Sequence, residues 1–441
     1  MLGKLKYYLF GTIFRRGATV LTLLTFGSYL LGLARDMLFA RVFGASRLLD
    51  IYNAAFIIPD LMLNIFVAGA LTAAFVPIFM HLRAVGKERE ADEVATTMIF
   101  SAPLSMLAIG LAVFAFMPWL SGIVAPGFIG PDKELLLMMT RLMLLSPIIF
   151  ALSNTLGNML ISSERFLSYG LSPILYNLGI IAGIPLTKIF GSAGLVYGVV
   201  IGALLHLTIR VWEIYKRRFN LQKPDFGNTH FLKILKMMIP RMAGQPIEQL
   251  IFFIFTNMAS GLFAGSIAIL SFARNFQSVP VSLFGISFST AVFASLSRKA
   301  ALGDKAGFRY HFGETAKALV FTTIPAAIFL FFFGELIIKI FLGGGRFTET
   351  SVVETGRLLA IFSFAIPAES FLHLIARSFY ALKDTWTPLL ITVPGLGLIA
   401  LLAKLLVPLL SLPALPLSYA AIFNLEAIIL YLILRRKIQQ I

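Results

Sequence analysis

Two arginines stand inside stretches of the sequence that are otherwise apolar enough to cross a membrane. Arg35 lies in GLARDMLFARVFGA, residues 32–45, and Arg274 lies in LSFARNFQSVP, residues 270–280. A charge at the centre of a membrane helix costs about 2.5–3.5 kcal/mol, so such residues usually serve a function. A guanidinium carries a planar fork of N–H groups that binds phosphate oxygens in pairs. The two arginines, with their neighbours Asp36 and Asn275, therefore predict a site for a phosphate or pyrophosphate group.

Arg35 has a second interpretation. If the first helix ends near Leu33, the arginine would extend to the outer headgroups and serve only as an interfacial anchor. The following segment MLFARVF stays apolar for two more turns, which favours a position inside the membrane.

Other polar residues fall on the expected second and seventh helices. Asp60 and Asn64 are four residues apart and share one helix face, and Asn53 precedes them as a further candidate for substrate binding. Glu248 is a candidate for ion or proton coupling, although a local pair with Arg241 near the cytoplasmic interface would explain it equally well.

A stripe of three titratable or charged residues is expected on the tenth helix. Glu369, His373 and Arg377 follow one another at four-residue spacing, so a helix places them on one face. Glu369 and His373 could relay a proton or an ion, or the three side chains could form a ladder of salt bridges.

The composition indicates a polytopic membrane protein. The chain has 441 residues, of which 58% are hydrophobic and 13% charged, whereas soluble domains are about 45–50% apolar and 25% charged. The net charge of +16 fits cytoplasmic loops rich in Lys and Arg better than nucleic-acid binding. The five histidines do not cluster at metal-ligand spacing and no nucleophile–base pair is legible. We therefore expect no enzyme, no metal and no cofactor.

The hydropathy pattern predicts an all-α protein of about twelve transmembrane helices. Lys and Arg gather on one side of the expected spans, which predicts that both termini are cytoplasmic. The predicted helices span residues 17–43, 50–81, 94–118, 134–162, 168–189, 192–215, 232–263, 266–297, 312–342, 352–381, 386–409 and 415–435.

The two halves of the sequence repeat. IFVAGALTAAF at residues 65–75 matches LFGISFSTAVF at 283–293, and TRLMLLS at 140–146 resembles GRLLAIFS at 356–363. Parallel repeats of this kind occur in transporters that move two lobes about a central site. We predict two lobes of six helices each, residues 1–222 and 223–441.

Several motifs, taken in order, cover essentially the whole chain. They are SYLLGLARDMLFARVFGAS followed by Asp50, FVAGALTAAFVPIF (66–79), VAPGF (124–128), ERFLSYGLSPILYNLG (164–179), SFARN (271–275), GRFT (345–348) and FYALKDTWTP (379–388). This set resembles the MurJ/MviN family of lipid II flippases, in the multidrug/oligosaccharidyl-lipid/polysaccharide exporter superfamily that also holds the MATE transporters.

The resemblance implies a function and a site. The family transports the undecaprenyl-pyrophosphate-linked peptidoglycan precursor, lipid II, from the inner to the outer leaflet by alternating access about a cationic cavity. Arg35 and Arg274 match cavity arginines, and Ser28 and Asp36 match other motif positions. The implied partners are lipid II or a related polyprenyl-pyrophosphate lipid, membrane lipids and the cell-wall synthesis machinery. The implied location is the bacterial cytoplasmic membrane.

The chain also departs from the family pattern. Tyr29 and Leu63 stand where the family commonly has arginines, the expected helix at 386–409 has no carboxylate for a sodium site, and two further helices that many members have are not expected. Three alternatives therefore stay open: an exporter of another polyprenyl-linked glycan, an exporter of an amphipathic drug, and a membrane scaffold that does not transport. Retention of both arginines favours an anionic lipid headgroup.

Overall fold

The computed structural model is all α-helical in the residues that it describes, which are 13–66, 68–216, 219–244 and 247–439. Ten of the described helices are long and apolar enough to cross a membrane, and an eleventh span results if one bent pair is counted as a single crossing. The predicted all-α fold with its apolar spans is confirmed.

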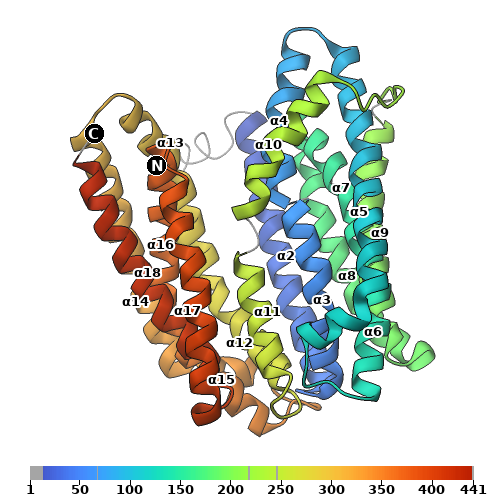
Figure 1. Cartoon of the computed structure of the whole chain (residues 1–441), viewed down its shortest axis with the longest axis vertical. Helices are drawn as coiled ribbons and strands as arrows, with labels where there is room; N and C mark the ends of the chain where they lie inside the picture. Colours follow the sequence, from blue (N-terminus) through green and yellow to red (C-terminus); the bar gives the residue numbers. More distant parts are fainter. Residues whose placement is uncertain (1–12, 67, 217–218, 245–246, 440–441) are drawn as a thin grey trace, which may run out of the picture. The chain divides into compact units, whose positions relative to one another are not determined.

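The chain forms two compact units (Figure 1). The first holds residues 1–42 and 51–249, and the second holds residues 43–50 and 250–441. The predicted boundary at residue 222 and the unit boundary at residue 249 differ because α10 packs against α4 and α5 of the first unit. The predicted division into two six-helix lobes, residues 1–222 and 223–441, therefore stays a prediction.

The first unit contains nine helices in its described residues. They are α2 (Ile13–Phe43), α3 (Arg47–Phe66), α4 (Ala68–Ala84), α5 (Glu88–Val124), α6 (Pro131–Met143), α7 (Leu145–Ser162), α8 (Phe166–Phe190), α9 (Ala193–Lys216) and α10 (Thr229–Gly244). The loop after α9 returns to α5, where the Thr97 hydroxyl accepts a hydrogen bond from the Asp225 backbone N–H at 3.0 Å.

The second unit contains eight α-helices and one π-helix in its described residues. Its elements are α11 (Ile247–Ala259), α12 (Ser266–Pro280), the π-helix η1 (Val281–Ile286), α13 (Ser287–Ala301), α14 (Lys305–Phe341), α15 (Glu349–Ser363), α16 (Ile366–Ala381), α17 (Trp386–Leu410) and α18 (Ala414–Ile438). Its apolar core includes Phe308, Leu374, Phe379 and Leu434, which α13, α14, α16 and α18 bring together.

Two spans that were predicted as single helices are interrupted at residues that the structure describes. The predicted span 134–162 is α6 and α7, and the span 352–381 is α15 and α16, which meet at 43°. Pro147 and Pro367 follow these junctions, and proline has no N–H for the carbonyl four residues earlier. In the first case the Ser146 hydroxyl donates to that carbonyl, of Met143, at 2.8 Å. The first division falls within TRLMLLS and the second directly after GRLLAIFS, a motif pair on which the predicted repeat rests.

Glycines bring α8 and α9 into unusually close contact. A Cβ added at Gly198 would lie 2.5 Å from the Cα of Gly183, and a Cβ at Gly179 would overlap the backbone of Gly202. Small residues at such crossings let helix backbones approach in membranes, where packing rather than the hydrophobic effect holds helices together. The α8–α9 pair therefore depends on these glycines.

We expect Gly198→Ala to lower the free energy of unfolding by about 1–3 kcal/mol, because the added methyl overpacks a backbone contact. The measurement is thermal unfolding of the purified chain in detergent. Gly397→Ala on α17 is the matched control, since nothing lies within 4 Å of a Cβ at that position. Equal melting temperatures for the Gly198 variant and the wild type would contradict the close α8–α9 packing.

Candidate functional site

The first polar cluster surrounds Arg35 on α2. The Arg35 Nε and Nη2 atoms donate to the Asp36 carboxylate at 3.0 and 2.8 Å, and Nη1 donates to the Asn177 side-chain oxygen at 3.0 Å. Asn177, on α8, donates in turn to the Ser28 hydroxyl at 3.4 Å. Ser28, Arg35 and Asp36, which the sequence placed in one motif, thus form one hydrogen-bonded network.

The Arg35 guanidinium keeps binding capacity within this cluster. A guanidinium has five N–H donors, and the recorded bonds within the described residues occupy three of them. The side chain is 28% exposed, so it is neither sealed in the core nor freely solvated. Asp36 fixes the plane of the fork and leaves two donors for an incoming anion.

Asp60 and two tyrosines lie near this arginine. Asp60 on α3 is exposed and lies within electrostatic range of Arg35, as do Tyr52 and Tyr176. Arg35 is thus balanced by nearby carboxylates. A phosphate bound here would depend on hydrogen-bond geometry more than on net positive charge.

The second polar cluster is formed by Arg274, Gln277 and Glu369, all less than 8% exposed. The Arg274 Nη2 donates to Glu369 Oε1 at 2.9 Å, and the Gln277 amide donates to Glu369 Oε2 at 3.0 Å. The guanidinium also lies over the rings of Phe252 and Tyr419, at 5.5 and 5.2 Å from their centroids. In this conformation the fork of Arg274 is occupied by a protein carboxylate.

Two members of the stripe predicted on α16 bind neighbouring helices, and the relay of a proton or ion through Glu369 and His373 stays a prediction. Glu369 pairs with Arg274 on α12 and interacts electrostatically with His373. Arg377 donates to the Thr290 hydroxyl on α13 at 2.8 Å. Glu369 and Arg377 therefore bind other helices rather than each other along α16.

The other predicted residues are more dispersed. Asn64 donates to the Asp60 backbone carbonyl within α3 at 2.9 Å, and Asn53 is half-buried on the same helix. Asn275 is exposed although its neighbour Arg274 is buried, and Glu248 is exposed at the start of α11. The side chain of Arg241 lies outside the described residues.

Sequence reasoning did not single out Arg210, a buried cation on α9. Its guanidinium is 2% exposed and donates to the Ser153 carbonyl at 2.8 Å, to Asn154 at 3.0 Å and to the Ser172 hydroxyl at 3.0 Å. A Cβ at Gly157 would lie 2.5 Å from this guanidinium. Neutral oxygens therefore hold α7, α8 and α9 around one charge. The presence of an arginine within the mostly apolar predicted span 192–215 could have revealed Arg210.

Residues 43–50 connect α2 to α3 but pack in the second unit. The fully buried Asp50 accepts hydrogen bonds from the backbone N–H groups of Gly265 at 2.6 Å and Ala268 at 2.9 Å. A carboxylate at a helix N-terminus satisfies otherwise unpaired donors and interacts favourably with the helix dipole. Asp50, in the first turn of α3, therefore fixes this segment to the start of α12.

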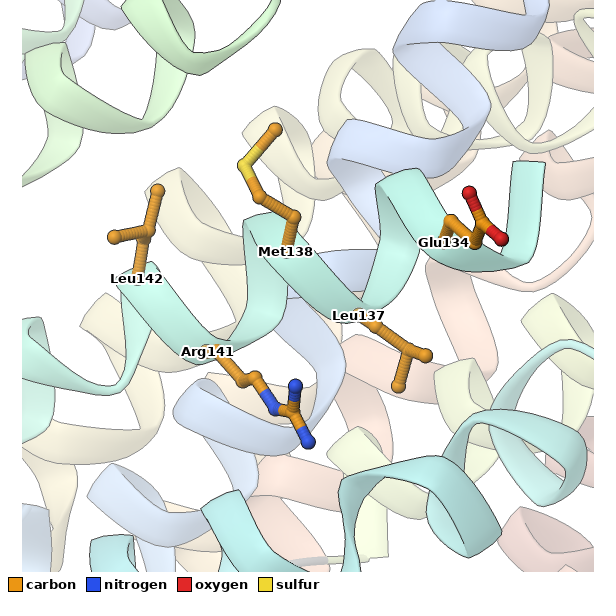
Figure 2. A pocket seen from close by; sticks show the side chains of 5 residues that line it. All are labelled: Glu134, Leu137, Met138, Arg141 and Leu142. Carbon is orange, nitrogen blue, oxygen red and sulfur yellow. The ribbon is translucent and has the colours of Figure 1, made fainter. Parts of the chain in front are cut away.

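A hollow of about 410 Å³ lies away from the predicted site residues, along α6. Figure 2 shows that its five lining residues, Glu134, Leu137, Met138, Arg141 and Leu142, all come from that helix. The Arg141 guanidinium lies 4.5 Å from the centre of the Phe114 ring. A hollow formed by one helix face does not enclose a ligand, so the two polar clusters remain the better candidates.

Comparison with protein families identifies relatives over nearly the whole chain. The family model described as "Lipid II flippase MurJ" matches residues 39–441. The probable lipid II flippase MurJ of Buchnera aphidicola subsp. Acyrthosiphon pisum is 28% identical over 375 residues, which cover 83% of this chain and 73% of that protein. The lipid II flippase MurJ of Burkholderia cenocepacia is 27% identical over 425 residues, which cover 92% of this chain and 81% of that protein.

Solved structures agree with these relatives. A lipid II flippase MurJ in an inward closed conformation matches with a TM-score of 0.81 and 26% identity, covering 95% of this chain and 87% of that one. An inward-facing MATE family multidrug transporter of the MOP superfamily also gives a TM-score of 0.81, at 15% identity, covering 96% and 98% of the two chains. The second likeness shows the shared fold alone.

We expect the Arg274–Glu369 pair to show strong energetic coupling. Arg274→Gln or Glu369→Gln alone should destabilise the chain by about 3–5 kcal/mol, because each leaves a buried charge without its partner. The double variant should recover part of that loss. The measurement is a double-mutant cycle on thermal unfolding in detergent, and additive effects of the two substitutions would contradict the pairing.

Proposed function

The chain belongs to the lipid II flippase MurJ family, and on that premise we propose that it carries lipid II from the inner to the outer leaflet of the bacterial cytoplasmic membrane. It is a multi-pass membrane protein of a transporter family. Translocation makes and breaks no covalent bond, so the proposed activity is transport and not catalysis. The side rich in Lys and Arg is the cytoplasmic side in this proposal.

The headgroup assignment rests on a single observation, which is the hydrogen bonding and partial exposure of the Arg35 guanidinium. Its guanidinium is oriented by Asp36 and Asn177, partly exposed, and left with two unoccupied donors within the described residues. A charge-assisted hydrogen bond to a phosphate oxygen contributes roughly 1.5–3 kcal/mol. A pyrophosphate presents several such oxygens, so it fits a preoriented fork better than a cationic or neutral drug does.

The second polar cluster has a different part in this proposal. Arg274 is closed against Glu369 in this conformation, so it can bind a phosphate only after that carboxylate moves away. We therefore assign first contact with the headgroup to Arg35, Ser28 and Asn177. Arg274 would take part later in the cycle, when the lobes alternate access to the two sides of the membrane.

Another polyprenyl-pyrophosphate glycan is the second candidate substrate. The family resemblance implies arginines at the positions of Tyr29 and Leu63, and Tyr29 is 53% exposed on α2. A pyrophosphate is common to both candidate lipids, so Arg35 serves either one. The enzymes that consume the delivered lipid on the outer side, the cell-wall synthesis machinery, are the proposed functional partners.

We expect Arg35→Ala to weaken binding of a pyrophosphate-linked polyprenyl lipid by at least tenfold, since a loss of about 1.4 kcal/mol is sufficient. Arg35→Lys should restore binding only in part, because an ammonium lacks the planar fork. The measurement is lipid binding to purified chain in detergent, with lipid II and a second pyrophosphate glycolipid as separate ligands.

Arg41→Ala is the matched control for this test, because Arg41 is an exposed arginine on the same helix. Thermal unfolding of every variant shows whether it is folded. If folded Arg35→Ala binds both lipids as the wild type does, Arg35 is an interfacial anchor and the headgroup assignment is wrong. If the wild type binds the second glycolipid more tightly than lipid II, the substrate is a polyprenyl-pyrophosphate glycan of that second class.

A further inference from the structure

Glu426 is a buried carboxylate in the middle of an intramembrane helix. It stands midway between Ala414 and Ile438, the first and last residues of α18, and it is 6% exposed. No hydrogen bond or ion pair from another described residue reaches its carboxyl group. An acidic side chain at this depth is costly and usually functional, and neither polar cluster uses it.

The neighbouring helix is shaped to receive this side chain. A Cβ at Gly395 on α17 would overlap the Glu426 carboxyl oxygen, so the carboxyl lies directly against the backbone of this glycine. Pro394, immediately before it, lacks an N–H and removes one backbone hydrogen bond from α17. The carboxyl thus lies against a weakened point of the adjacent helix.

No charge compensates Glu426 within the part of the chain that the structure describes. The main helices packed against α18 are α14, α15, α16 and α17, and Phe255 of α11 and Arg274 of α12 also contact its Tyr419. No charged or titratable side chain of these helices comes within electrostatic range of Glu426. Several of those charges are engaged elsewhere or exposed: Glu369 pairs with Arg274, Lys339 pairs with Glu349, Arg377 donates to Thr290, and Lys404 is exposed.

The absence of a charged partner decides what this carboxyl binds. An ionised carboxylate in an apolar interior costs far more than its neutral form, so an unpaired group takes up a proton. A hard metal ion would instead need several oxygen ligands, and no group of three or more His, Asp or Glu side chains in the described residues could hold one. The surroundings therefore suit a single proton.

We propose that Glu426 is a proton-binding site of the second unit, and that proton uptake and release there are coupled to movement of α17 against α18 during transport. This inference rests on the proposed lipid translocation. The carboxyl holds a proton while it is packed against Gly395 and releases it when α17 moves and water reaches the group. The proton adds to one carboxylate oxygen and leaves from it, and no other bond changes.

The first test measures proton binding without any transport. The unfolded chain exposes the carboxyl and releases its proton at neutral pH, whereas the folded chain retains it. The folded state then binds one more proton, so stability falls as pH rises, by up to tenfold in the unfolding equilibrium per pH unit. Between pH 5 and 9, the melting temperature of Glu426→Gln should fall less than that of the wild type and exceed it at the alkaline end.

Glu335→Gln is the control, since Glu335 is an exposed carboxyl on α14, and its pH profile should follow the wild type. Parallel profiles for the wild type and Glu426→Gln would overturn the proposal. Parallel profiles are informative only if Glu426→Gln folds, so a second measurement uses the wild type alone.

A hydrophobic carbodiimide adds to protonated intramembrane carboxyls, so mass spectrometry of the wild type should find Glu426 modified at pH 7 and much less at pH 10. No modification at pH 7 would also overturn the proposal.

The second test separates this site from the proposed function. In lipid vesicles, a pH gradient should change the lipid II translocation rate of the wild type at least several-fold and that of Glu426→Gln not at all. An equal gradient effect in both would overturn proton coupling while leaving translocation intact. If the wild type translocates no lipid but the stability difference is present, the proposed function fails and the proton site stands.

Discussion

The cost of placing charge inside a membrane is the constraint on which this structure depends. Each deeply placed charge has a distinct local solution. Arg210 is held by neutral oxygens of three helices, and Arg274 is neutralised by Glu369. Arg35 is only partly satisfied by Asp36 and Asn177. The incompletely satisfied charge is the one able to bind a ligand, since its remaining donors gain more from a phosphate than from an apolar surrounding.

The same constraint separates structural from functional polar groups elsewhere. Asp50 is fully buried, yet two backbone N–H groups at the start of α12 satisfy it, and it fixes residues 43–50 within the second unit. Glu426 is buried to a similar degree without such donors. Burial alone therefore does not mark a functional group. The decisive feature is whether the surrounding residues provide a partner.

Much of the fold could be predicted because long apolar runs and loop charges are local signals. The helices α8, α9, α17 and α18 correspond closely to predicted spans, and α5 extends six residues beyond its predicted span at each end. The divided spans were missed because an apolar run continues through Pro147 and Pro367, and hydropathy does not register a missing N–H. Proline alone does not identify these junctions, since Pro103 and Pro118 lie inside the continuous helix α5 and Pro173 lies inside α8.

The candidate site was less predictable because its partners are distant in the sequence. Motif resemblance located Ser28, Arg35 and Asp36, and Asn177 lies within another of the motifs, but nothing in the sequence pairs Asn177 with Arg35, 142 positions away, or Glu369 with Arg274, 95 positions away. Helical spacing along α16 suggested either a relay or a ladder of salt bridges within that helix, whereas Glu369 pairs with Arg274 of α12. Glu426 was overlooked because one acidic residue hardly alters the hydropathy of a long apolar helix.

Translocation by the purified chain in lipid vesicles tests the central claim most directly. Lipid II placed in both leaflets is degraded from outside by a membrane-impermeant enzyme, so transport exposes the inner pool with time. We predict that wild-type chain exposes nearly all the lipid while Arg35→Ala exposes little more than the outer half. If vesicles containing the wild-type chain retain the same protected half as protein-free vesicles, under imposed pH and voltage gradients of either sign, the account is wrong.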